Sequence, residues 1–276
     1  MIPTTSIFCL LALLAPANSH QPASNWRTDP IWYDGLVEKA TYDASRPIYG
    51  RDRPYTAIFF TNKEQHDTRT WTKASSSAST REVFKHNQVD DIPTPNYLYH
   101  FRTTSHLTTD TLELTRLESS SQEFCGTSFK QITRDGKGDN FSYWGFSYMP
   151  EAGHAEAQMT GRIVPFNALP LYLRDFDFSK PAGTEVKLML LPDQKSHKST
   201  PAQVTLATIK YAGVEDGSFK LTVHADGSLT NNGLLGTFYF ATDRLHVMTR
   251  YEGTDGQRYV LKSVERNNYW TIASEK

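Results

Sequence analysis

The sequence predicts a mainly β protein, built from antiparallel strands with one short helix near the middle of the chain. Apolar and polar residues alternate with a period of two in several segments, as they do on a half-buried strand. Asp-Gly and Asn-Gly pairs, which favour tight turns, lie between several of these segments. One mid-chain segment instead has the three-and-four spacing of a helix.

The clearest strands lie in the last quarter of the chain, where Phe219, Leu221 and Val223 alternate with polar residues. The turn pairs divide this region into a predicted meander with strands at 218–226, 234–241, 246–252 and 257–266. β-Branched and aromatic residues predict a strand at 54–61, and alternation predicts one at 97–102. Leu112 and Leu114 follow the alternation of apolar and polar residues, but Leu117 does not. We therefore expect a bulge near Arg116.

The helical spacing is carried by four apolar residues between positions 165 and 176: Phe166, Leu169, Leu173 and Phe176. Residues at these steps share one face of a helix. Pro170 would either kink this helix or begin its second half.

The first residues have the layout of a secretory signal peptide, predicted to span residues 1–19. An apolar run from Ile7 to Ala15 precedes Ala17-Asn18-Ser19, a small-residue cleavage site. The run is shorter than the about 20 residues of a membrane span, and no later stretch predicts a transmembrane segment. We therefore expect an exported protein, either periplasmic or extracellular.

The mature chain is predicted to begin with a flexible N-terminus at 20–31. Residues 32–276 then form a single β-rich domain, or two packed halves at 32–162 and 163–276; the length allows both. The 29 basic and 30 acidic residues nearly balance, without the basic excess of a nucleic-acid binder. Nucleic acid is therefore not an expected partner.

Cleavage would remove Cys9 and leave Cys125 alone, so no intrachain disulfide is expected. The sequence favours Cys125 as a buried cysteine that packs like a small hydrophobe. A nucleophilic thiol is the alternative, and paired carboxylates such as Glu118 and Glu123 are another, but neither has a diagnostic spacing. We predict no catalytic residue and no cofactor.

The histidines show none of the usual zinc motifs. His100 and His106 would share one face of a strand but lie about 20 Å apart at roughly 3.3 Å per residue. No metal site is therefore predicted.

Aromatic residues crowd the segment from Phe141 to Tyr148 so densely that both faces of a strand carry rings. One face would pack in the core. The other, which includes Trp144, would cover the helix or a ligand, although core packing alone also accounts for such a cluster.

The segment Ser120-Ser121-Gln122-Glu123-Phe124-Cys125-Gly126 resembles a family of exported bacterial proteins and lipoproteins that carry Ser-Ser-Gln-Glu-Trp-Cys-Gly in mid-chain. Shorter matches lie at Trp32-Tyr33-Asp34-Gly35 and Tyr259-Val260-Leu261-Lys262. Members are sometimes labelled septum formation inhibitors, but the sequence has no nucleotide-binding feature that would support that label. The middle helix and the late meander are also similar to outer-membrane lipoprotein carriers, which implies an open or flattened barrel around a short helix.

These observations lead to a function hypothesis without catalysis. The protein would bind an apolar ligand or lipid between the sheet and the helix, using Phe166, Leu169, Leu173, Phe176 and Trp144. One alternative is an envelope scaffold that holds a protein partner. A hydrolase with a thiol or carboxylate site is a further alternative.

Overall fold

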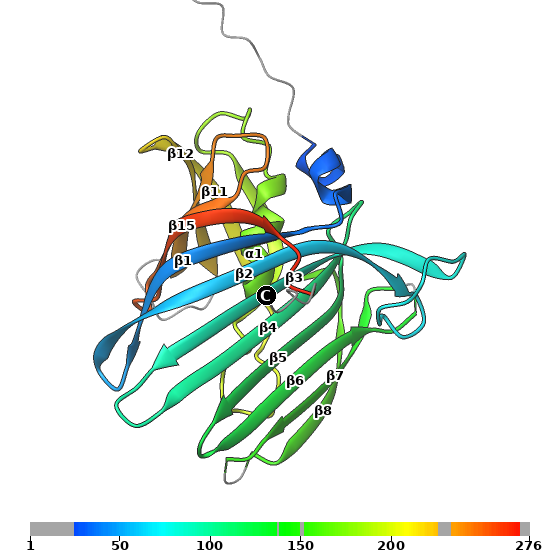
Figure 1. Ribbon diagram of the computed structural model, residues 1–276, viewed down its shortest axis with the longest axis vertical. Coiled ribbons are helices and arrows are strands. Elements are labelled where there is room, and N and C mark those ends of the chain that lie inside the picture. The colour runs from blue at the N-terminus through cyan, green and yellow to red at the C-terminus, as the bar shows by residue number, and fades with distance from the viewer. Residues whose placement is uncertain (1–24, 137, 150–151, 226–232, 271–276) are drawn as a thin grey trace, which may run out of the picture.

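The computed structural model describes residues 25–270 except 137, 150–151 and 226–232 (Figure 1). Within these residues the first part of the chain forms eight strands: β1 (Val37–Ile48), β2 (Arg51–Asp67), β3 (Thr80–Pro93), β4 (Leu98–Thr108), β5 (Leu114–Glu123), β6 (Gly126–Arg134), β7 (Asn140–Ser147) and β8 (His154–Thr160). The second part forms seven: β9 (Ile163–Pro165), β10 (Glu185–Leu191), β11 (Thr205–Glu215), β12 (Ser218–Ala225), β13 (Leu234–Ala241), β14 (Met248–Gly253) and β15 (Arg258–Asn267).

All described strands belong to one sheet, which curves into an open, barrel-like shape (Figure 1). Its order is β8-β7-β6-β5-β4-β3-β2-β1-β15-β14-β13-β12-β11-β10-β9. The pairs are antiparallel, apart from the parallel pair of β9 and β10. Because β1 pairs with both β2 and β15, the two halves of the chain join along this central strand. The predicted fold class, a mainly β open barrel with a short mid-chain helix, is confirmed.

The local predictions follow the observed register closely. Strands β12 to β15 form the expected meander, and Asp216 and Gly217 both have positive φ at the turn before it. His106 pairs with Arg116 and Leu107 with Leu114, so one extra residue of β5 lies between them. This is the bulge that the broken alternation near Arg116 predicts.

The predicted helix is a continuous helical segment made of three short pieces. These are the 3₁₀ turn η3 (Phe166–Ala168), the helix α1 (Leu169–Tyr172) and the 3₁₀ turn η4 (Leu173–Asp175). Pro170 lies in the first turn of α1, where its missing N–H removes no helical hydrogen bond. The segment lies within the curve of the sheet (Figure 1), where Leu169 and Leu173 are buried.

The N-terminal region differs from the sequence expectation. Residues 1–19, the predicted signal peptide, lie outside the described residues. Part of the predicted flexible stretch, however, forms the turns η1 (Trp26–Thr28) and η2 (Pro30–Tyr33). The Trp26 ring stacks on Phe84 with ring centroids 5.0 Å apart, and Trp32 donates a hydrogen bond to the Trp26 carbonyl. Two buried tryptophan side chains therefore hold this segment in place, although its polar residues had indicated a flexible chain.

A buried ion pair fixes the end of the helical segment to the sheet. The Arg174 guanidinium donates to both carboxylate oxygens of Glu38 on β1, over 2.7 and 3.1 Å. Both side chains are almost fully buried. Each charge has lost its contact with water, and its attraction to the opposite charge offsets that loss.

Among the described residues, no helix is long and apolar enough to cross a membrane.

Candidate functional site: an apolar hollow beside the helical segment

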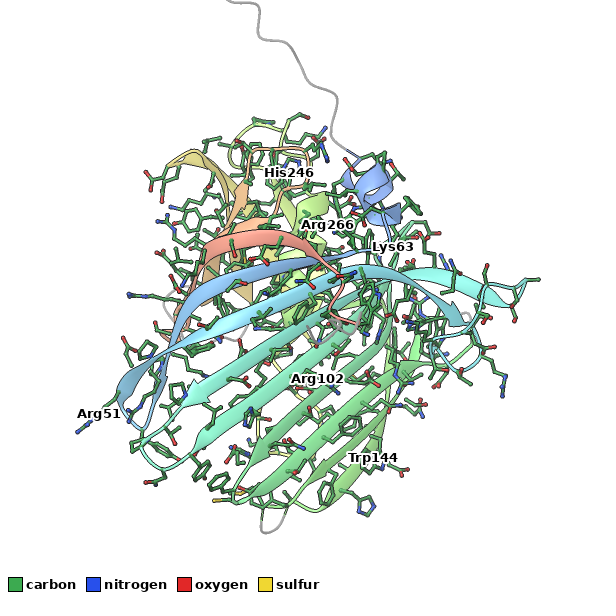
Figure 2. The ribbon with its side chains drawn as sticks, viewed as in Figure 1. Arg51, Lys63, Arg102, Trp144, His246 and Arg266 are labelled. Carbon is green, nitrogen blue, oxygen red and sulfur yellow. The ribbon has the colours of Figure 1, made fainter. Side chains whose placement is uncertain are left out.

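The structure brings together four of the five predicted ligand-binding residues and separates the fifth from them. Phe166, Leu169, Leu173 and Phe176 all belong to the apolar cluster between the helical segment and the sheet. Trp144 lies on β7, far from this cluster in the sheet, and is 40% exposed (Figure 2). Its ring contacts Phe129 instead, with centroids 5.9 Å apart.

The first two residues of the helical segment's apolar face lie in a closed environment. The Phe166 ring meets the Phe238 and Tyr251 rings at centroid distances of 6.2 and 6.0 Å. Leu169 is fully buried. The cavity beside Phe166 has a volume of only about 10 Å³, which is room for one water at most. This end of the segment packs the core and leaves no space for a ligand.

Polar side chains complete this closed end. Lys195 forms an ion pair with Asp90 on β3, and both are buried. Gln88 donates a hydrogen bond of 2.7 Å to the Tyr259 hydroxyl, and burial raises the pKa of that phenol well above its usual range. These groups satisfy one another, as buried polar groups must.

Leu173 and Phe176, in contrast, line an open hollow of about 240 Å³. Its floor is apolar and comes from β10 and β11. It is lined by Thr111, Leu112, Arg162, Tyr172, Leu173, Asp175, Phe176, Asp177, Lys180, Thr184, Val186, Leu188 and Ile209. Val186 is 46% exposed here, whereas Leu188, two residues further on the same face of β10, is 8% exposed. The hollow therefore presents uncovered hydrocarbon at a concave surface.

Charged groups stand at the rim of this hollow. Lys180 pairs with Asp177 at 3.6 Å, and Asp175 pairs with Arg27 at 3.1 Å. The exposed Arg162 donates to the Thr111 carbonyl over 2.9 Å and has no carboxylate partner in the part of the chain that the structure describes. The Arg162 guanidinium can therefore donate hydrogen bonds to a carboxylate or phosphate group of a ligand.

The hollow has the features of a small-molecule binding site. Its described lining includes threonine, tyrosine, lysine and aspartate but no cysteine, histidine or serine. Burial raises the pKa of the Tyr172 phenol, which stays neutral at physiological pH. An apolar floor with few polar groups at its edge is typical of a small-molecule site.

A second, more polar hollow lies beside the same residues 175–177. Its volume is about 540 Å³, and Arg27, Asp243 and Arg244 contribute to its lining. Arg244 is already paired with Asp29 at 2.6 Å. The two hollows differ in chemistry, and only the smaller one has a mostly aliphatic floor.

The prediction that Cys125 is buried is wrong. It lies in the tight turn between β5 and β6, where the strand alternation ends, and its side chain is exposed. Its Sγ lies 3.0 Å from the Tyr97 hydroxyl, and the Phe124 ring stacks on Tyr97 at 4.8 Å. That hydrogen bond raises the pKa of Tyr97, so this phenol is a poor base for activating a thiol.

The sequence reasoning missed Val186, Leu188 and Arg162. Val186 and Leu188 alternate with Lys187, which is a strand signal of the kind that identified the other strands. Arg162 carries no such signal, because its place at the hollow depends on the turn between β8 and β9. Only the folded chain brings it to the helical segment.

A solved structure resembles this chain at the level of the fold. No protein-family model matches the chain, and no curated protein matches it. The structure is similar to a crystal structure from Brucella abortus, described as a beta-barrel-like protein of the domain of unknown function DUF1849. The two share 10% sequence identity, with a TM-score of 0.50 over 84% of this chain and 98% of that chain. This likeness shows a β-barrel-like fold, and membership of the exported family with the Ser-Ser-Gln-Glu segment stays a prediction.

Proposed function

We propose that the protein is a non-catalytic binder of a small amphiphile, whose apolar chain occupies the hollow beside Leu173 and Phe176. The observation that carries the proposal is the exposure of Val186 on a concave apolar floor. Covering such a surface is favourable by roughly 25 cal/mol per Å² of apolar area. Among the described residues, the apolar cluster between the helical segment and the sheet is buried, so we place the ligand in this hollow.

The volume of the hollow sets the size of the ligand. At about 30 Å³ for a water-sized group, 240 Å³ holds roughly eight methylene-sized groups. At about 0.8 kcal/mol for each buried CH₂, the apolar part contributes about 6 kcal/mol at most. That free energy corresponds to a Kd of tens of micromolar or weaker. A short acyl chain therefore fits the site, while most of a long lipid chain would stay outside.

Arg162 suggests the other half of the ligand. An exposed guanidinium without a carboxylate partner among the described residues favours an anionic head group at the rim. The predicted export of the chain would place this ligand in the periplasm or outside the cell. An acyl chain with a carboxylate or phosphate head meets both requirements.

The test is a calorimetric titration with straight-chain carboxylates from hexanoate to dodecanoate. We expect the affinity to rise about fourfold for each added CH₂, as 0.8 kcal/mol implies, and to level off near eight carbons. Val186→Gln should weaken binding about tenfold. Val260→Gln, at a 51% exposed valine on β15, is the matched control and should bind like the wild type.

Two results would contradict this function. An affinity that rises through dodecanoate without levelling off would indicate binding to a flat surface. Equal losses in the Val186 and Val260 variants would show that the hollow has no special role.

A second candidate function, a scaffold for a protein partner, has its own observation. Trp144 and Phe146 are each 40% exposed on β7, beside the edge strand β8. Exposed aromatic residues of this kind are enriched at protein interfaces. Crosslinking in cells from position 146 would identify such a partner, and an absence of crosslinked protein would argue against it.

A further inference from the structure

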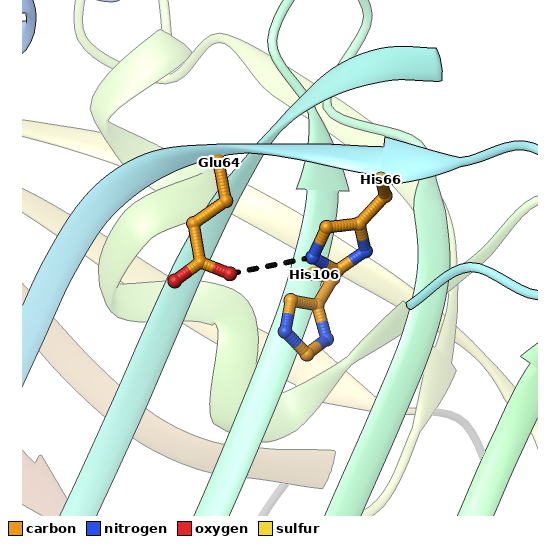
Figure 3. A group of neighbouring side chains, drawn as sticks. All are labelled: Glu64, His66 and His106. Atoms are coloured by element: carbon orange, nitrogen blue, oxygen red, sulfur yellow. Dashed lines mark hydrogen bonds and ion pairs between the residues drawn. The ribbon is translucent and has the colours of Figure 1, made fainter. Parts of the chain in front are cut away.

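Three potential metal ligands meet on the face of the sheet opposite to the helical segment (Figure 3). Glu64 and His66 lie on β2, and His106 lies on β4. Phe59 and Thr61 point into the barrel, so the alternation of β2 turns Glu64 and His66 to the other face.

The register of the sheet brings these residues together across an intervening strand. Lys85 on β3 pairs with Asn62 on one side and with His106 on the other. His106 is therefore diagonal to Glu64, two strands away. The rings of His66 and His106 have centroids 4.7 Å apart. Because His106 lies on a different strand from Glu64 and His66, the sequence shows no metal-binding motif that contains all three residues.

The Glu64–His66 distance fits two ligands of one metal ion, and it also lies at the long limit of a hydrogen bond. One donor atom from each residue lies within 4.8 Å of the others. Glu64 Oε2 and His66 Nε2 are 3.4 Å apart, which is long for a hydrogen bond between nitrogen and oxygen. Two ligands of one tetrahedral zinc ion, each about 2.0–2.1 Å from the metal, lie about 3.3 Å apart.

Buried nitrogen atoms in this cluster also lack partners. His66 and His106 are 2% and 5% exposed, and within the described residues the Nδ1 atom of each ring makes no hydrogen bond, although in His66 it is Nε2 that faces Glu64. Buried polar atoms normally have a partner.

We propose that Glu64, His66 and His106 bind a divalent transition metal ion, with Zn²⁺ as the best match. Two imidazoles and one carboxylate form a common zinc ligand set, which leaves a fourth position for water or a substrate atom. Imidazole ligands favour zinc, copper, nickel or iron over magnesium and calcium.

The surroundings of Glu64 limit how it would bind the ion. Its Oε1 atom lies 3.2 Å from Lys85 Nζ and 3.7 Å from Lys73 Nζ. Only Oε2 faces the histidines, so the carboxylate binds through one oxygen. The two ammonium groups orient the carboxylate and also repel a cation. We therefore expect an affinity in the micromolar range, weaker than that of a structural zinc site.

The experiment is a titration of the chelator-treated protein with Zn²⁺ by calorimetry, and with Co²⁺ by visible absorption. We expect one equivalent of either ion and a tetrahedral or five-coordinate Co²⁺ spectrum. His66→Ala and His106→Ala should each weaken Zn²⁺ binding at least tenfold. His100→Ala is the matched control, because His100 lies on the same face of β4 but is exposed and pairs with Asp91.

Two outcomes would overturn the proposal. One is wild-type protein that binds less than one equivalent of Zn²⁺ at 100 μM free ion, on the order of a hundredfold above the expected Kd. The other is binding that the His66 and His106 substitutions leave unchanged or that His100→Ala weakens equally. If an alanine variant does not fold, as judged by circular dichroism, Glu64→Gln replaces it. This substitution keeps the side-chain shape and must also weaken Zn²⁺ binding at least tenfold.

Discussion

The two ends of the helical segment face different surroundings, although the same apolar pattern runs through both. At the first end, Phe166 and Leu169 pack against rings and aliphatic groups and leave about 10 Å³ of space. At the second end, Leu173 and Phe176 border a hollow of about 240 Å³. One end is therefore built for stability, and the other offers a surface that a ligand can cover.

The difference arises from what faces each end of the segment. The closed end meets the curved sheet from both halves of the chain, with the Asp90–Lys195 ion pair beside it. The open end meets β10, β11 and the loops that carry Leu112 and Arg162, near the edge of the sheet at β9. Substitutions should therefore affect stability at the closed end and binding at the open end.

The largest expected effect comes from breaking the buried ion pair at Arg174. Arg174→Ala would leave Glu38 charged and buried, and should lower the free energy of unfolding by about 3–5 kcal/mol. The measurement is urea unfolding followed by circular dichroism. Lys180→Ala, which removes an exposed ion pair nearby, should cost no more than about 1 kcal/mol. A comparable decrease in the free energy of unfolding in both variants would show that burial does not determine how much an ion pair contributes to stability.

Leu169→Ala should have the next largest effect. Removing this fully buried side chain leaves a cavity and should lower the free energy of unfolding by about 2–5 kcal/mol. Carboxylate affinity, measured where the variant is still folded, should stay within about twofold of the wild type. A large loss of affinity without loss of stability would place the ligand at the closed end instead.

A smaller effect should appear on acidification, through His86. Burial, helped by Arg174, lowers the pKa of this histidine to about 3, whereas the unfolded chain has a value near 6.5. Between these values the unfolded state binds the extra proton, so stability present above pH 6.5 is lost as the pH falls toward 3. His86 alone should reduce the free energy of unfolding by about 1–2 kcal/mol between pH 7 and pH 5.

Urea unfolding at pH 7, 6 and 5 would measure this loss. His86→Gln should flatten the dependence on pH. An unchanged slope in His86→Gln would mean that other groups cause the acid sensitivity.

Much of the fold could be predicted from the sequence because its signals are local. The alternation in 218–266, the turn at Asp216-Gly217 and the spacing from Phe166 to Phe176 each lie within a few residues. The burial of Trp26 was not predicted, because it depends on Phe84, far along the chain. Cys125 was misplaced for a related reason, since an apolar neighbour such as Phe124 also occurs in exposed turns.

The candidate site could be predicted only in part. Leu173 and Phe176 were identified from their spacing, but the same spacing also selected Phe166 and Leu169, which lie in the closed core. Which end stays open depends on the edge of the sheet, and no local pattern encodes that edge. Similarly, His106 becomes a neighbour of Glu64 and His66 only through the register of β2, β3 and β4.

The most direct test of the binding site is photocrosslinking with a medium-chain carboxylate that carries a diazirine near its apolar end. Proteolysis and mass spectrometry would then locate the labelled residues. We predict labelling within 172–188, reduced by excess octanoate and by Val186→Gln. Labelling concentrated around Phe166 or Trp144, or labelling that octanoate does not reduce, would contradict the assignment of the hollow as the binding site.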